Sequence, residues 1–297
     1  MKPIYGEIEC QNEKCKNKAY WEYDNNYLCG VHSKKYKDRI PLKKDNKKKD
    51  ELFTQKLLKE KEECERASKI NKLKNKRGDI VCSKLRMMHN PDDIEEYIKV
   101  FPNFKHGNRR DGLGLPSLSP KSIGPVNHNQ PGLPPAKNIE NFHQGNKVFP
   151  IEVDENGEPT EIFFRTRLDM YNSDIPLRHK AVSNGKNVPL YSIWVDQEFE
   201  EHKISYFTSR QFYCHFYERD LLKKGTNSNN DYTYLMSLLD DGFNLQIIGY
   251  DGYNVNKDIE ECYLDCSKPF GHELVLYTML KYKEDLWPLR KYKTFNF

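Results

Sequence analysis

Four candidate metal ligands near the N-terminus limit most strongly how this chain can fold. Cys10 and Cys15 are followed by Cys29 and His32, with Gly30 inside the second pair. Two close pairs of soft or borderline ligands, separated by the length of a strand, a turn and a strand, are typical of tetrahedral zinc. Bound zinc would supply folding free energy that a segment of about 40 residues cannot obtain from its own core. The pattern predicts a zinc-binding module.

The predicted zinc has a structural role. All four ligands come from the protein, so no position stays open for the water that a catalytic zinc needs. The alternative is that the four side chains are ordinary buried or surface residues. The remaining cysteines have no comparable pairing, and we interpret them as small apolar residues: Cys64, Cys82, Cys214, Cys262 and Cys266.

The composition indicates a polar protein with an aromatic core. Of 297 residues, 31% are charged and 37% are hydrophobic, so the core must rely on the 19 Tyr and 15 Phe residues. No apolar run approaches the length of about 18 residues that a membrane span needs, and the N-terminus lacks the layout of a signal peptide. We therefore expect an intracellular protein without a membrane partner. The net charge is only +4, but most of the basic excess precedes residue 80.

The chain is expected to have three parts: the zinc module at 1–40, a basic charged linker helix at 41–77, and an α+β domain at 78–297. In the last part we expect a mainly helical fold with short strands, with these elements in chain order. A Pro/Gly-rich functional loop covers 102–137, a helix runs from 137 to 148, a hairpin turns within 151–165, helices cover 204–223 and 231–240, a strand covers 244–251, and an amphipathic helix covers 270–286.

Three chemically complementary side chains fall on one face of the helix expected at 137–148. Glu140, Gln144 and Lys147 stand at i, i+4 and i+7. An amine can attack a sugar aldehyde or C1 centre, a carboxylate can move protons, and an amide can hold a hydroxyl. The lysine would need a lowered pKa, which burial or a second cation could give. The alternative is a surface stripe stabilised by ordinary side-chain pairing.

The surroundings of this trio resemble the NADAR (YbiA-like) family, in which an L-S-N-F loop precedes a helix with the pattern E-H-x-x-Q-x-x-K. Leu118 and Ser119 match the loop motif, while Pro120 and Lys121 replace its Asn and Phe. The trio matches the helix pattern, with Asn141 in place of the family's His. The resemblance is at the level of motifs and covers residues 115–286.

Further matches lie downstream. The order of a helix, a strand leading to Asp251, and a last helix starting at Gly271 is similar to the family, and Trp194 is a looser match. The resemblance implies hydrolysis of an N-glycosidic bond in a ribosylated or ADP-ribosylated nucleobase or nucleotide. It implies Lys147 as a Schiff-base nucleophile and Glu140 as general acid/base, with Asp251 assisting. The substrate-binding residues would be Ser119, Gln144, Trp194 and Gly271. Independently of the resemblance, we expect Arg210, next to Ser209 and Gln211, to face a ligand.

Two basic segments could bind phosphate, or could equally be solvated loops. One contains Arg165, Arg167, Arg178, His179 and Lys180, and the other contains His106, Arg109 and Arg110. The chain has no P-loop, dinucleotide-binding, zincin or nucleophile-elbow motif, which argues against kinases, Rossmann dehydrogenases, zincin proteases and α/β-hydrolases.

Two functional hypotheses remain. The first is a NADAR-like N-glycosidase whose basic N-terminal half holds nucleic acid. The alternative is a non-catalytic, nucleic-acid-binding or virion-associated zinc protein, in which Lys147 would be exposed or ion-paired without a pocket beside it. The bias toward Lys, Asn, Ile and Tyr, with the segment CGVHSKK, resembles proteins of large AT-rich DNA viruses; a viral protein would work in the host cytoplasm, the nucleus or the virion.

Overall fold

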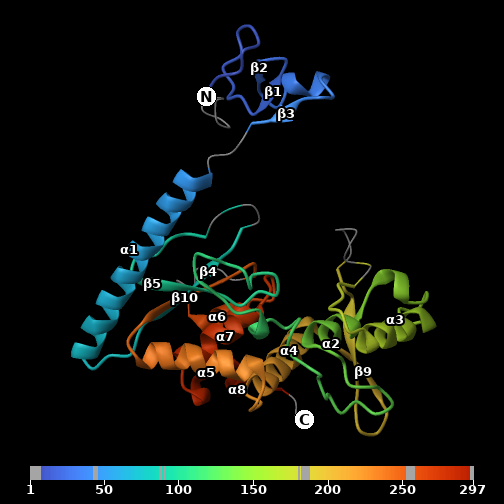
Figure 1. Ribbon diagram of the computed structural model, residues 1–297. Helices are drawn as coiled ribbons and strands as arrows, with labels where there is room; N and C mark the ends of the chain where they lie inside the picture. Colours follow the sequence, from blue (N-terminus) through green and yellow to red (C-terminus); the bar gives the residue numbers. More distant parts are fainter. Residues whose placement is uncertain are drawn as a thin grey trace. The chain divides into compact units, whose positions relative to one another are not determined.

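The computed structural model describes residues 8–42, 46–86, 89, 91–179, 181, 188–251 and 258–294, with only the backbone of 46–49 (Figure 1). The chain forms two compact units, Met1–Glu60 and Lys61–Phe297. The boundary lies inside the helix α1 (Asn46–Leu73). Helices and sheets are both present, in agreement with the α+β class.

The first unit contains a three-stranded antiparallel sheet. Its central strand β1 (Trp21–Tyr23) pairs with β2 (Asn26–Leu28) and with β3 (Ile40–Pro41). The two residues between β1 and β2, Asp24 and Asn25, have φ angles of 46° and 60°, the left-handed conformation that a two-residue hairpin turn requires. This tight turn brings the segments before and after the hairpin close together.

Helix α1 agrees with the helix expected at 41–77, but it is not exposed along its whole length. Cys64, Ala67 and Ser68 are buried. The Ser68 hydroxyl donates a hydrogen bond of 2.6 Å to the carbonyl of Asp241. The last turns of α1 therefore belong to the core of the second unit rather than to a free linker.

A four-stranded parallel sheet forms the centre of the second unit. Its strands stand in the order β4 (Ile80–Lys84), β10 (Asn244–Gly249), β5 (Tyr97–Phe101) and β6 (Leu113–Gly114). All six residues of β10 are buried, as expected for a central strand covered on both faces. Of these strands, the apolar pattern predicted β10 alone.

Helices cover the parallel sheet. The elements are α4 (Tyr206–Leu221), α5 (Asn227–Asp240), α6 (Ile259–Leu264), α7 (His272–Lys281), η5 (Glu284–Leu286) and α8 (Pro288–Lys291). Helix α7 contacts β4, β10 and α4. Its residues from 272 to 280 are all buried, so the prediction of an amphipathic helix at 270–286 is wrong: the helix is shorter and is covered on all sides.

A smaller antiparallel sheet stands beside this core, with the order β7 (Lys147–Val148), β8 (Tyr191–Val195) and β9 (Glu201–Ile204). Helices α2 (Ile139–Gly145) and α3 (Glu161–Asn172) pack against each other. The Pro/Gly-rich loop is ordered and irregular, with only β6 and the single turn η2 (Pro116–Leu118) inside it.

The helix expected from 137 to 148 is shorter than predicted. Asn138 caps its start by accepting a hydrogen bond of 2.9 Å from the backbone N–H of Asn141. The helix ends at Gly145, and Lys147 lies on β7, opposite Ser192 of β8. The prediction that Lys147 lies on this helix is therefore wrong, because strand pairing with β8 takes over the backbone hydrogen bonds.

The hairpin expected at 151–165 forms only in part. The turn is present, with Gly157 at a φ of 77° and a bridge between Val153 and Pro159. The second strand is absent, because helix α3 already begins at Glu161; the turn η3 (Pro150–Glu152) precedes the bridge.

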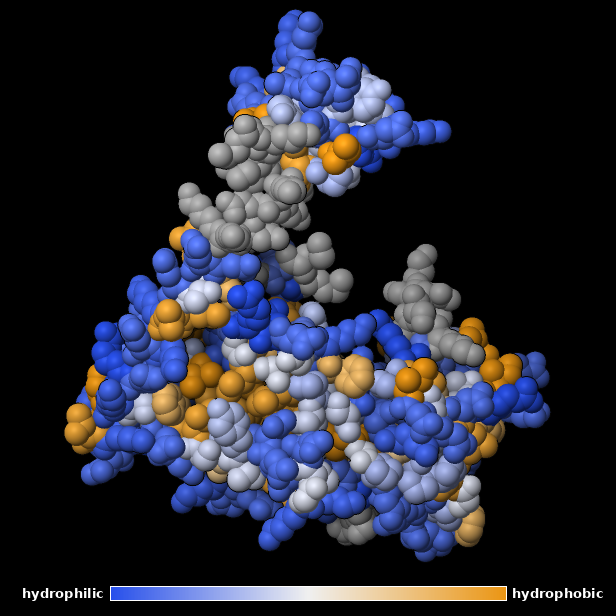
Figure 2. Space-filling view, viewed as in Figure 1, coloured by the Kyte–Doolittle hydropathy of each residue, from blue (hydrophilic) through white to orange (hydrophobic). Residues whose placement is uncertain are grey.

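In the described part of the chain, no helix has both the length and the apolar character needed to cross a membrane. Hydrophilic side chains cover most of the face seen in Figure 2.

The docking of α1 on the second unit can be tested at Asn71. Its amide donates to the Gly242 carbonyl at 2.9 Å and to Asn244 Oδ1 at 3.1 Å. Asn71→Ala should lower the free energy of unfolding by about 1–2 kcal/mol in urea denaturation. The matched control is Lys69→Ala, at an exposed position of the same helix. Equal stability of the two variants would contradict this docking.

Candidate functional site

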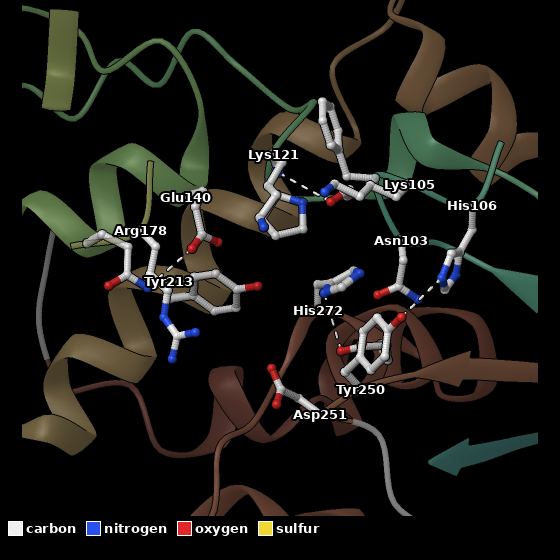
Figure 3. A pocket seen from close by; sticks show the side chains of 15 residues that line it. Asn103, Lys105, His106, Lys121, Glu140, Arg178, Tyr213, Tyr250, Asp251 and His272 are labelled. Carbon is white, nitrogen blue, oxygen red and sulfur yellow. Dashed lines mark hydrogen bonds and ion pairs between the residues drawn. The ribbon is translucent and has the colours of Figure 1, made fainter. Parts of the chain in front are cut away.

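A cavity of about 470 Å³ opens at the carboxyl ends of the parallel strands β10 and β5. Tyr250 and Asp251 follow β10 directly, and Asn103 follows β5 by two residues. In open sheets that contain parallel strands, this edge is the usual place for a ligand. Figure 3 shows Glu140, Arg178 and Tyr213 on one side of the cavity and Asn103, His106 and Tyr250 on the other.

A smaller cavity of about 200 Å³ adjoins the first. Glu140, Gln144, Tyr213 and Asp251 line both cavities, and Lys147 lines the smaller one. The predicted trio thus reaches one volume although Lys147 is on a strand. The side chains come from α2, α4, β7 and the end of β10, segments that are far apart in sequence.

Helix α2 presents Glu140 and Gln144 as a bonded pair. The Gln144 amide donates to Glu140 Oε1 at 3.2 Å. The Oε1 atom of Gln144 is buried and has no hydrogen-bond partner among the described residues. Buried polar atoms are rarely left in this state, which marks the pair as part of a site rather than of a surface stripe.

The amine of Lys147 is held in conditions that disfavour its charge. Burial is the main cause that lowers its pKa from 10.5 to about 8. The cation of Arg178 lowers it further, while the carboxylates of Glu140 and Asp251 oppose the shift. At pH 7 roughly 10% of such a lysine is a free amine, compared with less than about 0.1% for an ordinary lysine. Lys147 can therefore act as a nucleophile near neutral pH.

The segment that carries Arg178 is fixed by Asn141. The side chain of Asn141 is fully buried. It donates to the carbonyls of Ser173 and Ile175, both at 3.0 Å, and accepts from the Leu177 backbone N–H at 2.7 Å. These bonds position the residue that precedes Arg178.

A second anchor lies on the other side of Arg178. His179 Nε2 is 3.1 Å from Glu152 Oε1, and both side chains are buried. The ring of His179 stacks on Phe149, with 4.3 Å between the ring centroids. The backbone on both sides of Arg178 is thus anchored, and its exposed side chain lines the larger cavity.

Asp251 and Tyr213 add proton-carrying groups where the two cavities meet. Burial, followed by the charge of Glu273, raises the pKa of Asp251. Burial also raises the pKa of the Tyr213 phenol well above its usual range, with Tyr217 and Glu140 contributing. Tyr213 therefore stays protonated and can donate a hydrogen bond to a ligand.

The remaining predicted site residues differ in whether they are free to contact a ligand. Ser119 lines the larger cavity, and Gly271 lines the smaller one. Arg210 also lines the smaller cavity, but its guanidinium donates to the carbonyls of Tyr263, Asp265 and Lys268, which is a structural use.

Trp194 lies apart from both cavities. Its indole packs on Phe212, with 4.4 Å between ring centroids, and also on Phe216. The expectation that Trp194 contacts a ligand in these cavities is therefore wrong, because β8 directs the side chain into the aromatic core.

The two basic segments contribute fewer cations to the cavities than their sequences suggest. Arg109 pairs with Asp111 at 2.7 Å, Arg165 pairs with Glu161 at 3.2 Å, and Arg167 is buried over Phe163. Lys180 lies outside the described residues. Lys105, His106, Lys121 and Arg178 line the larger cavity. Pattern reasoning missed Asn103, His272 and Glu273; recognition of the strand at 97–101 would have pointed to Asn103.

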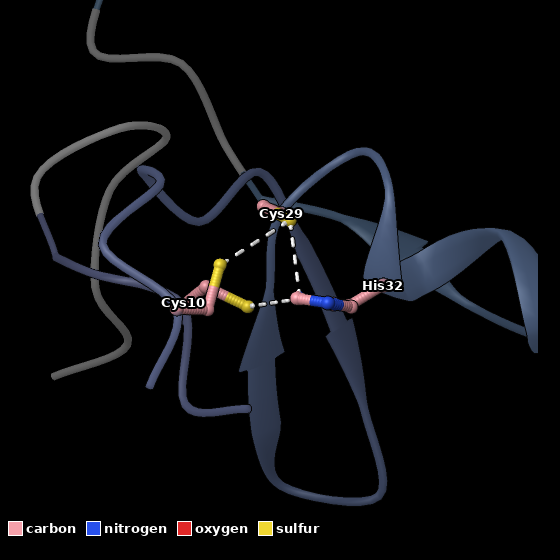
Figure 4. A group of neighbouring side chains, drawn as sticks. Cys10, Cys29 and His32 are labelled. Atoms are coloured by element: carbon pink, nitrogen blue, oxygen red, sulfur yellow. Dashed lines mark hydrogen bonds between the residues drawn. The ribbon is translucent and has the colours of Figure 1, made fainter. Parts of the chain in front are cut away.

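The four N-terminal ligands lie together, as Figure 4 shows for Cys10, Cys29 and His32. His32 Nδ1 is 3.4 Å from Cys10 Sγ and 3.5 Å from Cys29 Sγ, and the sulfurs of Cys15 and Cys29 are 3.9 Å apart. Ligands around tetrahedral zinc stand roughly 3.5–3.8 Å apart. The backbone N–H of His32 is the main cause that lowers the Cys29 pKa to about 6, which favours the thiolate that a metal binds.

The other cysteines mostly agree with the apolar interpretation. Cys64, Cys82, Cys214 and Cys262 are buried, whereas Cys266 is exposed. Cys266, which was also interpreted as a small apolar residue, lies in the exposed turn between α6 and α7.

The electrostatic control of Lys147 can be tested by removing the cation beside it. Arg178→Gln should raise the pKa of Lys147, because the arginine charge lowers it. Acetylation of Lys147 at pH 7.5, followed by mass spectrometry, should become about two- to fivefold slower. Arg165→Gln on α3 serves as the control, and its rate should match the wild type. An unchanged or faster rate in Arg178→Gln would contradict the assignment.

No protein-family model, curated protein or solved structure matches this chain. The resemblance to the NADAR family therefore stays a prediction, and the geometry of the two cavities and of the Cys/His cluster is the basis for assigning a function.

Proposed function

We propose that the second unit is an N-glycosidase of the NADAR type, which cleaves the bond between ribose and base in a ribosylated or ADP-ribosylated nucleobase or nucleotide. One observation carries the proposal: the amine of Lys147, with a pKa near 8, lines the smaller cavity together with the carboxylates of Glu140 and Asp251. The binding-protein alternative expects this lysine to lie without a pocket beside it.

The proposed reaction follows from the roles that these groups can take. The free amine of Lys147 attacks the ribose C1 carbon, the bond from C1 to the base nitrogen breaks, and the departing base takes up a proton. Glu140 accepts the proton that the attacking amine loses. Opening of the sugar ring then gives an imine between C1 and Lys147. Water hydrolyses the imine, which releases the sugar and restores the amine.

The charges of the cavity suit a substrate with phosphate groups. Lys105, Lys121 and Arg178 line the larger cavity, and cations of this kind bind phosphate oxygens. A volume of about 470 Å³ accommodates a nucleotide-sized ligand. Neutral Tyr213 adds a hydrogen-bond donor for a hydroxyl or a base edge.

The loop residues that depart from the NADAR pattern lie at the substrate. Pro120 and Lys121 replace the family's Asn and Phe, and both line the larger cavity. A charged chain replaces an aromatic ring there. We therefore infer a substrate that is more anionic at this position than the family pattern implies.

The chemistry can be tested by trapping the imine. Wild-type protein incubated with ribose 5-phosphate or ADP-ribose and borohydride should gain the mass of the reduced adduct at Lys147. Lys147→Ala should lose this adduct, whereas Lys137→Ala, at an exposed lysine near the start of α2, should keep it. Equal labelling of wild type and Lys147→Ala would refute the Schiff-base assignment.

For the first unit, we propose a structural zinc site formed by Cys10, Cys15, Cys29 and His32. Three sulfurs and one imidazole nitrogen suit Zn²⁺, and the four ligand atoms lie within 4.8 Å of one another. The module also presents Arg39 over the Trp21 ring at 4.5 Å. Cations over aromatic rings occur in surfaces that bind nucleic acid, and contact with nucleic acid is part of this proposal.

The zinc site can be tested by metal analysis. Purified protein should contain about one zinc per chain, and Cys29→Ser should lose it together with the fold of the first unit. Cys266→Ser, at an exposed cysteine of the second unit, should keep the zinc. Metal-free protein with unchanged thermal stability would show that the cluster is not a zinc site.

A further inference from the structure

A buried carboxylate lies beneath the proposed site, in a slot formed by two glycines. Glu273, in the first turn of α7, is only 1% exposed. A Cβ atom added at Gly249 would lie 1.9 Å from Glu273 Cγ, and one added at Gly271 would lie 2.5 Å from Glu273 Oε2. Both positions therefore require glycine, because any other side chain would displace this carboxylate.

The same geometry places Glu273 next to Asp251. The point where a Cβ of Gly271 would stand is 2.5 Å from Glu273 Oε2 and 3.5 Å from Asp251 Oδ2. The two carboxylate oxygens are thus no farther apart than the sum of these distances. Two carboxylates this close repel each other, and the repulsion favours the protonated form of one of them.

The neighbouring histidine contacts Glu273 without completing its hydrogen bonding. His272 Nε2 donates to the Pro102 carbonyl at 3.1 Å. Its Nδ1 lies 3.2 Å from Glu273 Oε2. This oxygen of Glu273 is buried and has no hydrogen-bond partner among the described residues. The charge of Glu273 acts on Asp251, where it raises the carboxyl pKa.

We propose that Glu273 is a positioning residue that keeps a proton on Asp251, so that Asp251 is the acid that protonates the departing base. This inference rests on the proposed N-glycosidase. It assigns different roles to the two carboxylates at the reacting carbon: Glu140 takes the proton from the Lys147 amine, and Asp251 supplies one to the base. Enzymes commonly use environments that separate the pKa values of two carboxyl groups, so that one acts as a base and the other as an acid.

The charged groups around Asp251 determine how strongly it holds the proton. Burial and the charge of Glu273 raise its pKa, whereas His272, Lys84 and Lys147 lower it, and the net direction is upward. Lys84 is the last residue of β4 and stands opposite Gly249 in the sheet. Glu273 is thus the main side-chain charge that favours the protonated form.

A direct test is the titration of the Asp251 carboxyl by ¹³C NMR, with Asp251→Asn used to assign its signal. The wild-type midpoint should lie above the ordinary value of 3.8. In Glu273→Gln, which keeps the shape and removes the charge, the midpoint should fall. Glu273→Asp should retain part of the upward shift. A wild-type midpoint at or below 3.8 would overturn the proposal even if Glu273→Gln does not fold.

The rate of base release gives a second readout. Each unit by which the Asp251 pKa falls lowers its protonated fraction at pH 7 about tenfold, and release of base from a ribosylated nucleotide should slow by the same factor in Glu273→Gln. Glu218→Gln, at a carboxylate that is also buried but pairs with Arg290 at 3.2 Å, should leave the Asp251 midpoint unchanged.

The two proposals can fail separately. A folded Glu273→Gln variant with an unchanged Asp251 midpoint, or with a lower midpoint and an unchanged rate of base release, would overturn the role of Glu273. A wild-type protein that shows the raised midpoint but forms no Lys147 adduct would instead refute the N-glycosidase.

Discussion

The account of this protein depends on one constraint, the removal of the Lys147 ammonium from water. Loss of solvent destabilises the ammonium form and so lowers the pKa of the amine, and a nearby cation strengthens this effect. Here the charge of Arg178 lowers the pKa of Lys147, while the charges of Glu140 and Asp251 raise it. The balance leaves a lysine that changes its protonation state near neutral pH, beside carboxyl groups that can exchange protons with a ligand.

Neutral hydrogen bonds in the surrounding structure hold these charges in place. Asn141 fixes the segment before Arg178 through three bonds to backbone atoms. The phenol of Tyr217 donates to the carbonyl of Leu118 at 2.6 Å and so holds the loop that carries Ser119. Buried polar groups with all their partners satisfied give a rigid, unique arrangement. Asn141, which is fully buried, therefore contributes to an organised site.

The sequence allowed the chemistry to be predicted better than the geometry. The Cys/His spacing located the N-terminal cluster, because metal ligands in small modules follow short and regular spacings. The spacing of Glu140, Gln144 and Lys147 placed them in one volume, but for the wrong reason: a helix of seven residues is followed by a strand whose direction again turns Lys147 inward. Single-sequence periodicity cannot detect such a change, since β8 supplies the hydrogen bonds.

Other features depend on contacts between distant segments. Glu273 looked like an ordinary charged residue of a terminal helix, and only the packing of Gly249 and Gly271 around it shows its buried position. Trp194 was predicted to bind substrate, but its indole packs on the aromatic ring of Phe212 in α4. Asn103 and Lys105 follow a strand whose place in the parallel sheet depends on β10, which is more than 140 residues away.

The most direct test of the central claim is a titration of Lys147 itself. Reductive ¹³C-methylation of the lysines, with Lys147→Arg used to assign the signal, would report the protonation state of this amine by NMR as the pH is raised. The account predicts a midpoint near 8. A midpoint at the ordinary value of 10.5 would show that the amine remains in bulk water and would contradict its role as a nucleophile.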